Sequence, residues 1–319
     1  MSRYVKISTL GRAPLTLAEI GDNINDIVEI VEKVKKIWQY ELEKVLSDKP
    51  DLIVLPECCD SVFGLNDDKK EEYEKIKGSQ IRDFFAKVAK ENNCYIAYSA
   101  SRCLPDGTKR NSTQLIDRKG NIAGIYNKNH VTIDENEENG TLYGADAKVI
   151  HCDFGRMACI ICFDLNYDEL RQKYIPQKPE VIIFSSLYHG GLMQRYWAYS
   201  CRSYFVGCVA GDENTIISPV GEVVARSTNY FNYLTHTINL DYIVCHLDYN
   251  MPKLQAVKKK YGRKVSIYDP GHLGSVLISS ETEEFTAMDI AKEFELELLD
   301  DYFERCRKHR SLPGKVEKI

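Results

Sequence analysis

The chain contains the sequence Met157-Ala158-Cys159-Ile160-Ile161-Cys162-Phe163-Asp164, in which an apolar run stops at a cysteine. Such a run predicts a short buried strand. Residues 165–174 follow, with acidic side chains early and basic side chains late, which is the charge order favoured by a helix dipole. A cysteine between a strand end and a helix N-terminus lies where a thiolate is stabilised and a small molecule can reach it. We therefore predict that Cys162 is a catalytic nucleophile.

The segments around this run alternate between strand and helix patterns. Residues 51–55 and residues 181–185 form continuous apolar runs, as expected for strands in the middle of a sheet. Residues 22–46 carry an apolar stripe at helical spacing. Hairpin turns are predicted at three glycine-containing positions, Asp106-Gly107, Lys119-Gly120 and Phe154-Gly155. Alternating helices and strands with interleaved hairpins predict an α/β fold with mixed sheets.

The composition is typical of a globular protein. Of the 319 residues, 44% are hydrophobic and 28% are charged, so a sizeable core is expected. The formal net charge of −5 argues against nucleic acid or an anionic membrane as the main partner. No apolar run approaches the roughly 20 residues of a membrane helix, and no signal-peptide pattern is present. The eleven cysteines are odd in number, which favours free thiols in a reducing cytoplasm.

The composition changes after residue 250, which predicts a main domain over residues 1–250 and a C-terminal extension over residues 251–319. Residues 242–248 are expected to complete the main sheet. The run Lys258-Lys259-Lys260 and Gly262 are typical of a linker. Residues 286–310 predict one final helix, which docks on the main domain or on a second subunit.

Three polar residues stand at the ends of apolar strands: Glu57, Lys128 and Cys162. A charged side chain at such a position is a poor choice for packing, because its burial without a partner costs several kcal/mol. Strand ends at one edge of an α/β sheet are also where reactive groups converge. The three side chains are therefore expected to meet in space.

Three segments resemble the ordered motifs of the nitrilase superfamily, the carbon–nitrogen hydrolases: Leu55-Pro56-Glu57, then Tyr126-Asn127-Lys128-Asn129-His130, then Ile161-Cys162-Phe163-Asp164 with Glu169. The resemblance covers roughly residues 4–248. It implies a four-layer α-β-β-α sandwich that assembles through its outer helices into a homodimer or higher homo-oligomer.

The resemblance also implies a role for each motif residue. Cys162 would be the nucleophile and would carry a thioester, and Glu57 would be the general base and acid. Lys128 would face the oxyanion together with the backbone N–H of Phe163, and such donors are worth about 3 kcal/mol each. No metal and no organic cofactor are required.

Members of this superfamily often carry a second glutamate in the loop after the lysine. Glu135, Glu137 and Glu138 are available here, and we favour Glu138 because its spacing to the following glycines resembles the family pattern. Four further residues are expected at the substrate pocket: Phe163, Asn166, Tyr188 and His189. Asn166 stands where many relatives have an arginine that can hold a substrate carboxylate, which disfavours an N-carbamoyl amino acid.

The expected substrate is a small amide, with a carbamoyl compound or a nitrile as alternatives. A catalytically silent scaffold protein is a competing interpretation, which the intact Glu57, Lys128 and Cys162 set disfavours. The Cys159-x-x-Cys162 spacing also matches a redox pair. Residues three apart in a strand point to opposite faces, so this pairing is disfavoured.

Overall fold

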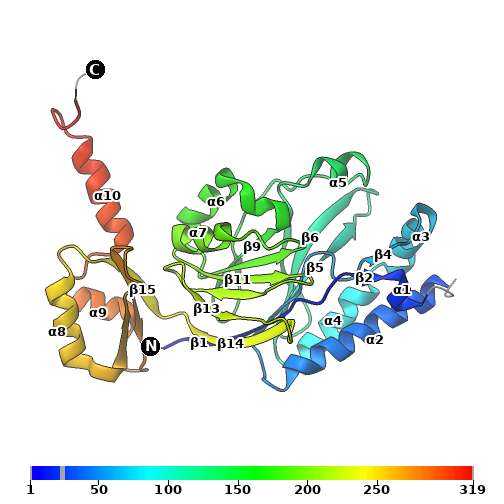
Figure 1. The fold of residues 1–319 in the computed structure, drawn as a ribbon, viewed down its shortest axis with the longest axis horizontal. Helices are drawn as coiled ribbons and strands as arrows, with labels where there is room; N and C mark the ends of the chain where they lie inside the picture. Colours follow the sequence, from blue (N-terminus) through cyan, green and yellow to red (C-terminus); the bar gives the residue numbers. More distant parts are fainter. Residues whose placement is uncertain (1, 22–25, 318–319) are drawn as a thin grey trace. The chain divides into compact units, whose positions relative to one another are not determined.

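Two six-stranded sheets form the centre of the unit Val5–Ile238 in the computed structural model, which describes residues 2–21 and 26–317 (Figure 1). The strands of the first sheet are, in order, β14 (Tyr233–Asn239), β1 (Tyr4–Leu10), β3 (Leu52–Val54), β5 (Tyr95–Cys103), β6 (Lys109–Ile116) and β7 (Ile122–Asn127). The strands of the second are β13 (Val223–Arg226), β12 (Thr215–Ile217), β11 (Tyr204–Val209), β10 (Val181–Ser186), β9 (Arg156–Ile161) and β8 (Ile150–His151).

The central strands of both sheets are parallel, and hairpins complete the edges. β1, β3 and β5 run parallel in the first sheet, and β9, β10 and β11 run parallel in the second. Every residue of β10 is buried, as its continuous apolar sequence predicts. The parallel strands end at the same edge of their sheet, and this shared edge positions the side chains that follow them.

Helices cover the outer face of each sheet. The helices α2 (Ile27–Leu46) and α4 (Gln80–Glu91) pack on the first sheet, and α6 (Asp168–Tyr174) and α7 (Leu192–Cys201) pack on the second (Figure 1). The hydroxyl of Ser185 in β10 donates to the carbonyl of Leu55 at 2.8 Å and so joins the two sheets. The predicted four-layer α-β-β-α sandwich is confirmed. Of the predicted helix over residues 22–46, residues 22–25 lie outside the described residues.

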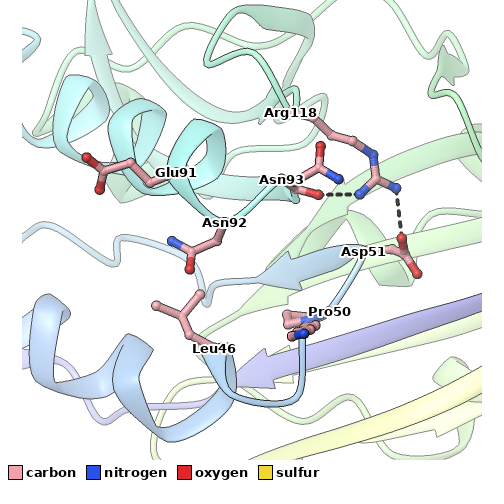
Figure 2. A pocket seen from close by; sticks show the side chains of 8 residues that line it. Leu46, Pro50, Asp51, Glu91, Asn92, Asn93 and Arg118 are labelled. Carbon is pink, nitrogen blue, oxygen red and sulfur yellow. Dashed lines mark hydrogen bonds and ion pairs between the residues drawn. The ribbon is translucent and has the colours of Figure 1, made fainter.

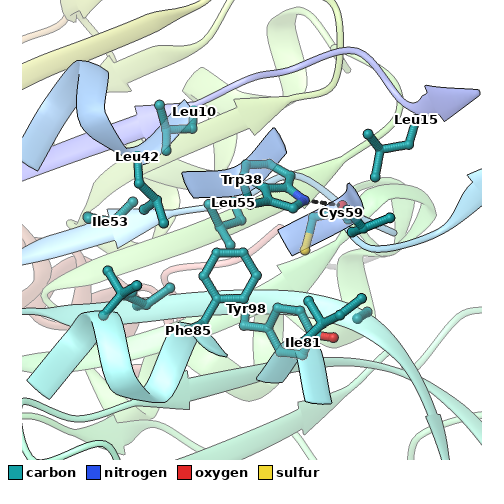
Figure 3. Close-up of a cluster of buried hydrophobic side chains, with 14 of the residues drawn as sticks. Leu10, Leu15, Trp38, Leu42, Ile53, Leu55, Cys59, Ile81, Phe85 and Tyr98 are labelled. Carbon is teal, nitrogen blue, oxygen red and sulfur yellow. Dashed lines mark hydrogen bonds between the residues drawn. The ribbon is translucent and has the colours of Figure 1, made fainter. Parts of the chain in front are cut away.

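Aromatic side chains fill the core between the first sheet and its helices (Figure 3). Trp38 and Phe85 meet edge to face with ring centroids 5.7 Å apart, and Phe85 lies 5.3 Å from the ring of Tyr98. Replacing a buried aromatic side chain by alanine costs about 3 to 5 kcal/mol. This cluster therefore fixes α2 and α4 against the strand that leads to Glu57.

Two helices form in segments that carry no apolar stripe at helical spacing. α3 (Asp67–Lys77) buries only two of its side chains, Tyr73 and Lys77, so it shows no apolar stripe. α5 (Ile133–Glu137) lies in the acidic loop and begins with a capping box formed by Thr132 and Glu135. Short elements complete this unit: β2 (Leu15–Thr16), α1 (Leu17–Ile20) and β4 (Val62–Phe63).

The second unit contains residues 2–4 and 239–317 and has its own core. It contains the sheet β15 (Tyr242–His246), β17 (Ser275–Ser280) and β16 (Val265–Tyr268), with the helices α8 (Met251–Tyr261), α9 (Ala287–Glu293) and α10 (Leu299–Arg310). The unit begins at Asn239 and not near residue 250, because β15 pairs with β17 and does not complete the main sheet.

Two further expectations for the C-terminal region are wrong. The three lysines of the predicted linker lie in α8, and the predicted final helix is two helices with a break between Glu293 and Leu299. None of the helices in the described part of the chain combines the length and apolar content of a transmembrane span.

Candidate active site

Three strand ends bring Glu57, Lys128 and Cys162 to one place. Glu57 is the third residue after β3, and Cys162 directly follows β9. Lys128 directly follows β7, and its backbone N–H donates to the carbonyl of Asn111 at 2.8 Å. The structure therefore brings the three sequence-predicted residues together.

Lys128 is buried between two carboxylates. Its Nζ lies 2.9 Å from Glu57 Oε1 and 2.8 Å from Glu135 Oε2, and the side chains of Lys128 and Glu57 are only 2% exposed. Burial alone would lower the pKa of Lys128, but the adjacent anionic groups, Glu57 foremost, outweigh it and raise this pKa above its ordinary value. Lys128 is therefore a fixed cation at the site.

Asn111 holds the two carboxylates at a set distance from each other. Its Nδ2 donates to Glu57 Oε1 at 2.8 Å and to Glu135 Oε1 at 3.0 Å. Asn111 lies in β6 and is itself buried. Nothing in the sequence alone singled out this residue, because one asparagine inside a predicted strand carries no distinctive spacing.

Cys162 occupies a tight turn close to the Glu57 carboxylate. It starts a 3-10 helix, Cys162–Asn166, with a φ of 47°, which side chains other than glycine rarely adopt. Glu57 Oε2 is buried and accepts no other hydrogen bond from the described residues, so it is available for the thiol proton. Burial and then the charge of Glu57 raise the pKa of the Cys162 thiol to about 12, against the opposing effect of Lys128.

This protonation state corrects the expectation that a helix N-terminus favours the thiolate. α6 begins at Asp168, several residues beyond the thiol, and the largest effect of a charge on the thiol comes from the Glu57 carboxylate, which raises its pKa. Cys162 is therefore a thiol near a carboxylate and not a thiolate stabilised by a helix.

Asp164 fixes the turn that presents Cys162. Its side chain is fully buried, and its Oδ2 accepts from the hydroxyl of Tyr126 at 2.7 Å and from the backbone N–H of Ile161 at 3.0 Å. Its Oδ1 accepts from the backbone N–H of His130 at 2.8 Å. One carboxylate therefore ties the strand before Cys162 to the segment that carries Lys128. Asp164 was part of the recognised motif, but its sequence position alone gave it no role.

Glu135, and not the favoured Glu138, is the glutamate of this loop that contacts Lys128. Glu135 accepts from Lys128 Nζ and, at 2.7 Å, from the backbone N–H of Thr132. Glu138 is the exposed C-cap of α5, on the far end of that short helix. The sequence did contain a signal, because Thr132-Ile133-Asp134-Glu135 has capping-box spacing and so points the side chain of Glu135 back toward the helix start.

The four predicted pocket residues divide into two groups. Asn166 Nδ2 donates to the carbonyl of Phe163 at 3.1 Å and to the hydroxyl of Tyr188 at 3.0 Å. Tyr188 is close enough to Cys162 to interact with its charge, and Asn166 links Tyr188 to Phe163, the residue after Cys162. His189 instead accepts from the backbone N–H of Gly191 at 3.1 Å within its own loop.

Comparison with known proteins identifies the family. A family model described as carbon-nitrogen hydrolase matches residues 16–244. The chain belongs to the carbon–nitrogen hydrolase family. Omega-amidase NIT2 of Xenopus tropicalis is 25% identical over 217 residues, which cover 60% of this chain and 78% of that protein. Deaminated glutathione amidase of Dictyostelium discoideum is 24% identical over 236 residues, which cover 63% and 81%.

Solved structures share the fold of this hydrolase. The NitFhit protein of C. elegans matches with a TM-score of 0.64 at 15% identity and covers 92% of this chain and 98% of its own. An amidase from Nesterenkonia sp. matches with a TM-score of 0.60 at 12% identity, with coverage of 82% and 97%. The predicted membership of the nitrilase superfamily is confirmed, and the chain is an amidase-like enzyme of carbon–nitrogen bonds.

A separate pocket of about 410 Å³ lies at the opposite end of β3 from Glu57 (Figure 2). Arg118 closes one side of it and donates to Asp51 Oδ1 at 2.8 Å and to the carbonyl of Asn93. The pocket is thus not part of the Glu57 site. Among the described residues of the hydrolase, no group of three or more His, Cys, Asp or Glu side chains is arranged to hold a metal ion.

Proposed function

We propose that this hydrolase cleaves the carbon–nitrogen bond of a small amide through a thioester on Cys162. The observation that carries the proposal is the Glu57 carboxylate: Lys128 holds its Oε1, its Oε2 is buried without a partner among the described residues, and it lies close enough to Cys162 to raise the pKa of the thiol. The amidases among its relatives support an amide as the substrate class.

The first half-reaction forms the thioester. Because so little thiolate exists at rest, the proton moves from Cys162 Sγ to Glu57 as the sulfur attacks the amide carbon. Lys128 and the backbone N–H of Phe163 stabilise the negative charge that develops on the amide oxygen. The carbon–nitrogen bond then breaks, and Glu57 returns the proton to the nitrogen, which leaves as ammonia or an amine.

The second half-reaction regenerates the thiol. A water molecule attacks the thioester carbon while Glu57 accepts one of its protons, and Lys128 again faces the oxyanion. The carbon–sulfur bond breaks, the carboxylic acid departs, and Glu57 returns its proton to Cys162. Lys128 holds Glu57 and Asn111 fixes its rotation, so the same oxygen serves each proton transfer.

The pocket supports an amide over an N-carbamoyl amino acid. Asn166 is neutral and its Nδ2 is already engaged by Phe163 and Tyr188, so it offers no cation to a substrate carboxylate. We further propose that the enzyme works in the cytoplasm as a homodimer or higher homo-oligomer on small molecules. Its eleven cysteines, all of them free, are in keeping with a reducing compartment.

The test combines ammonia release with trapping of the acyl-enzyme. A panel of primary amides, N-carbamoyl compounds and nitriles is incubated with wild-type protein, and intact mass followed by peptide mapping locates any adduct. Cys162→Ala should abolish both turnover and adduct, whereas the control Cys159→Ala, which removes a buried thiol in the preceding strand β9, should keep both. Full turnover by Cys162→Ala would refute the proposal. Absence of ammonia and adduct with every compound would favour a silent scaffold.

A further inference from the structure

A second buried ion pair lies just beyond the proposed base. Asp60 Oδ2 is 3.2 Å from Lys77 Nζ, and the two residues are 0% and 2% exposed. The hydroxyl of Tyr98 in β5 also donates to Asp60 Oδ2, and the hydroxyl of Tyr73 in α3 donates to the backbone carbonyl of Asp60 at 2.6 Å. None of these four residues belongs to the site described above.

The chain is clamped on both sides of Glu57. Before it, the backbone N–H of Leu55 donates to the carbonyl of Ala97 at 3.1 Å. After it, the backbone N–H of Cys59 donates to Ser99 at 3.1 Å, and the indole N–H of Trp38 donates to the carbonyl of Cys59 at 2.7 Å (Figure 3). The backbone of Glu57 thus lies in a short turn between fixed points, and Asp60 anchors its far end through a charged side chain.

A contribution to folding stability does not explain the Asp60–Lys77 ion pair. A buried ion pair usually contributes no more than apolar residues of the same volume, because both charges lose their hydration. Lys77 is nevertheless a cation: burial alone would lower its pKa, but Asp60 and Glu74 outweigh burial and raise this pKa above its ordinary value. Lys77 lies between Asp60 and Glu74, at 3.2 Å and 2.9 Å, and is separate from the lysine that contacts Glu57.

We propose that Asp60, held by Lys77 and Tyr98, is a positioning residue that fixes Glu57 against the Cys162 thiol. The inference rests on the proposed role of Glu57 as base. Loosening Asp60 should let the Glu57 turn shift away from the thiol, with two opposite effects. Turnover should fall because the base is misplaced, whereas the thiol should ionise more readily because a nearby negative charge has moved away.

The experiment measures both effects in Asp60→Asn and Tyr98→Phe. Turnover is measured on the best amide of the panel, and the rate of Cys162 labelling by iodoacetamide is followed by peptide mapping between about pH 7 and 10, around the ordinary thiol range. Glu57→Gln sets the labelling rate for complete loss of the carboxylate. Asp51→Asn is the matched control, because it breaks the Arg118 ion pair at the opposite end of β3.

Asp60→Asn should lower kcat about 10- to 100-fold with little change in KM, and Tyr98→Phe about 3- to 10-fold. Both should label Cys162 faster than wild type at the same pH, toward the rate of Glu57→Gln, while Asp51→Asn should match wild type. Tyr98→Phe keeps the ring and the ion pair, so it carries the test if Asp60→Asn does not fold.

If folded Asp60→Asn and Tyr98→Phe both keep the wild-type rate of Cys162 labelling and the wild-type kcat, the positioning role of Asp60 is refuted and the proposed function is not. Faster labelling in both variants, without turnover of any amide by the wild type, would support the positioning role and refute only the proposed substrate class. A wild-type Cys162 that reacts with iodoacetamide as fast as the exposed Cys103 and Cys306 over the whole pH range would overturn both the inference and the proposed function, because Glu57 would then have no effect on the thiol.

Discussion

Glu135 links Lys128 to the start of α5. Its carboxylate accepts hydrogen bonds from both Lys128 Nζ and the backbone N–H of Thr132, the N-cap of that helix. Its removal should leave Lys128 with one carboxylate and free to rotate. We expect Glu135→Gln to lower kcat about 10- to 100-fold, as for loss of a charge-assisted hydrogen bond. Steady-state kinetics of ammonia release test this, with the exposed Glu138→Gln as control. Equal losses in the two variants would contradict the assignment of Glu135.

The same contact predicts how stability depends on pH. Burial would raise the pKa of Glu135, but Lys128 and the hydrogen bonds from Thr132 and Asn111 lower it below its ordinary value. A carboxylate with a depressed folded-state pKa stabilises the fold above its unfolded pKa of about 4.3, and the contribution is lost as the pH falls through the folded value.

Glu135→Gln should therefore be less stable than wild type at pH 7, by about 1 to 3 kcal/mol, and the difference should shrink below about pH 4. Urea unfolding at several pH values measures both quantities. A gap that stays constant down to acid pH would show that the charge of Glu135 is not what stabilises the site.

At the scale of elements, the turn between β9 and α6 depends on one buried carboxylate. Asp164 receives hydrogen bonds at both oxygens, so Asp164→Asn places an amide N–H group against a donor. We expect a loss of about 3 kcal/mol in unfolding free energy and a larger loss of activity than of stability. Tyr126→Phe removes a single donor and should cost about 1 kcal/mol. Thermal melts and kinetics of the two variants give the comparison, and equal effects would contradict it.

The elements that sequence patterns predicted are those with an apolar signal. The buried strands and the apolar stripe of α2 were visible, and so was the convergence of Glu57, Lys128 and Cys162 at strand ends. α3 was missed because its few buried residues include a lysine, whose burial depends on Asp60. The role of Asn111 depends on cross-strand geometry, and the raised pKa of Cys162 depends on burial beside Glu57, neither of which is encoded in local spacing.

At the scale of the whole molecule, the two units have separate cores, which predicts separate cooperative unfolding. Ile278→Ala in β17 should destabilise the C-terminal unit by about 2 to 5 kcal/mol and lower hydrogen-exchange protection within residues 239–317. Ile182→Ala in β10 should instead lower hydrogen-exchange protection in the unit Val5–Ile238 and leave the C-terminal unit unchanged. Loss of protection over the entire chain in either variant would show one cooperative unit.

The boundary between these units was placed too late because the apolar sequence of β15 does not reveal which sheet it joins. Tyr242–His246 pairs with Ser275–Ser280, a partner that lies beyond a helix and another strand. A lysine run inside α8 was similarly taken for a linker, although the basic end of a helix is favourable beside its own carbonyl groups.

The protonated thiol of Cys162 bears on the chemical durability of the enzyme. Peroxides and other oxidants attack thiolates and convert them to sulfenic and then to irreversible acids. A thiol with a raised pKa is less open to this damage, although the side chain of Cys162 is partly exposed. Under the proposed mechanism, the sulfur would become reactive only when an amide carbon is present to receive it.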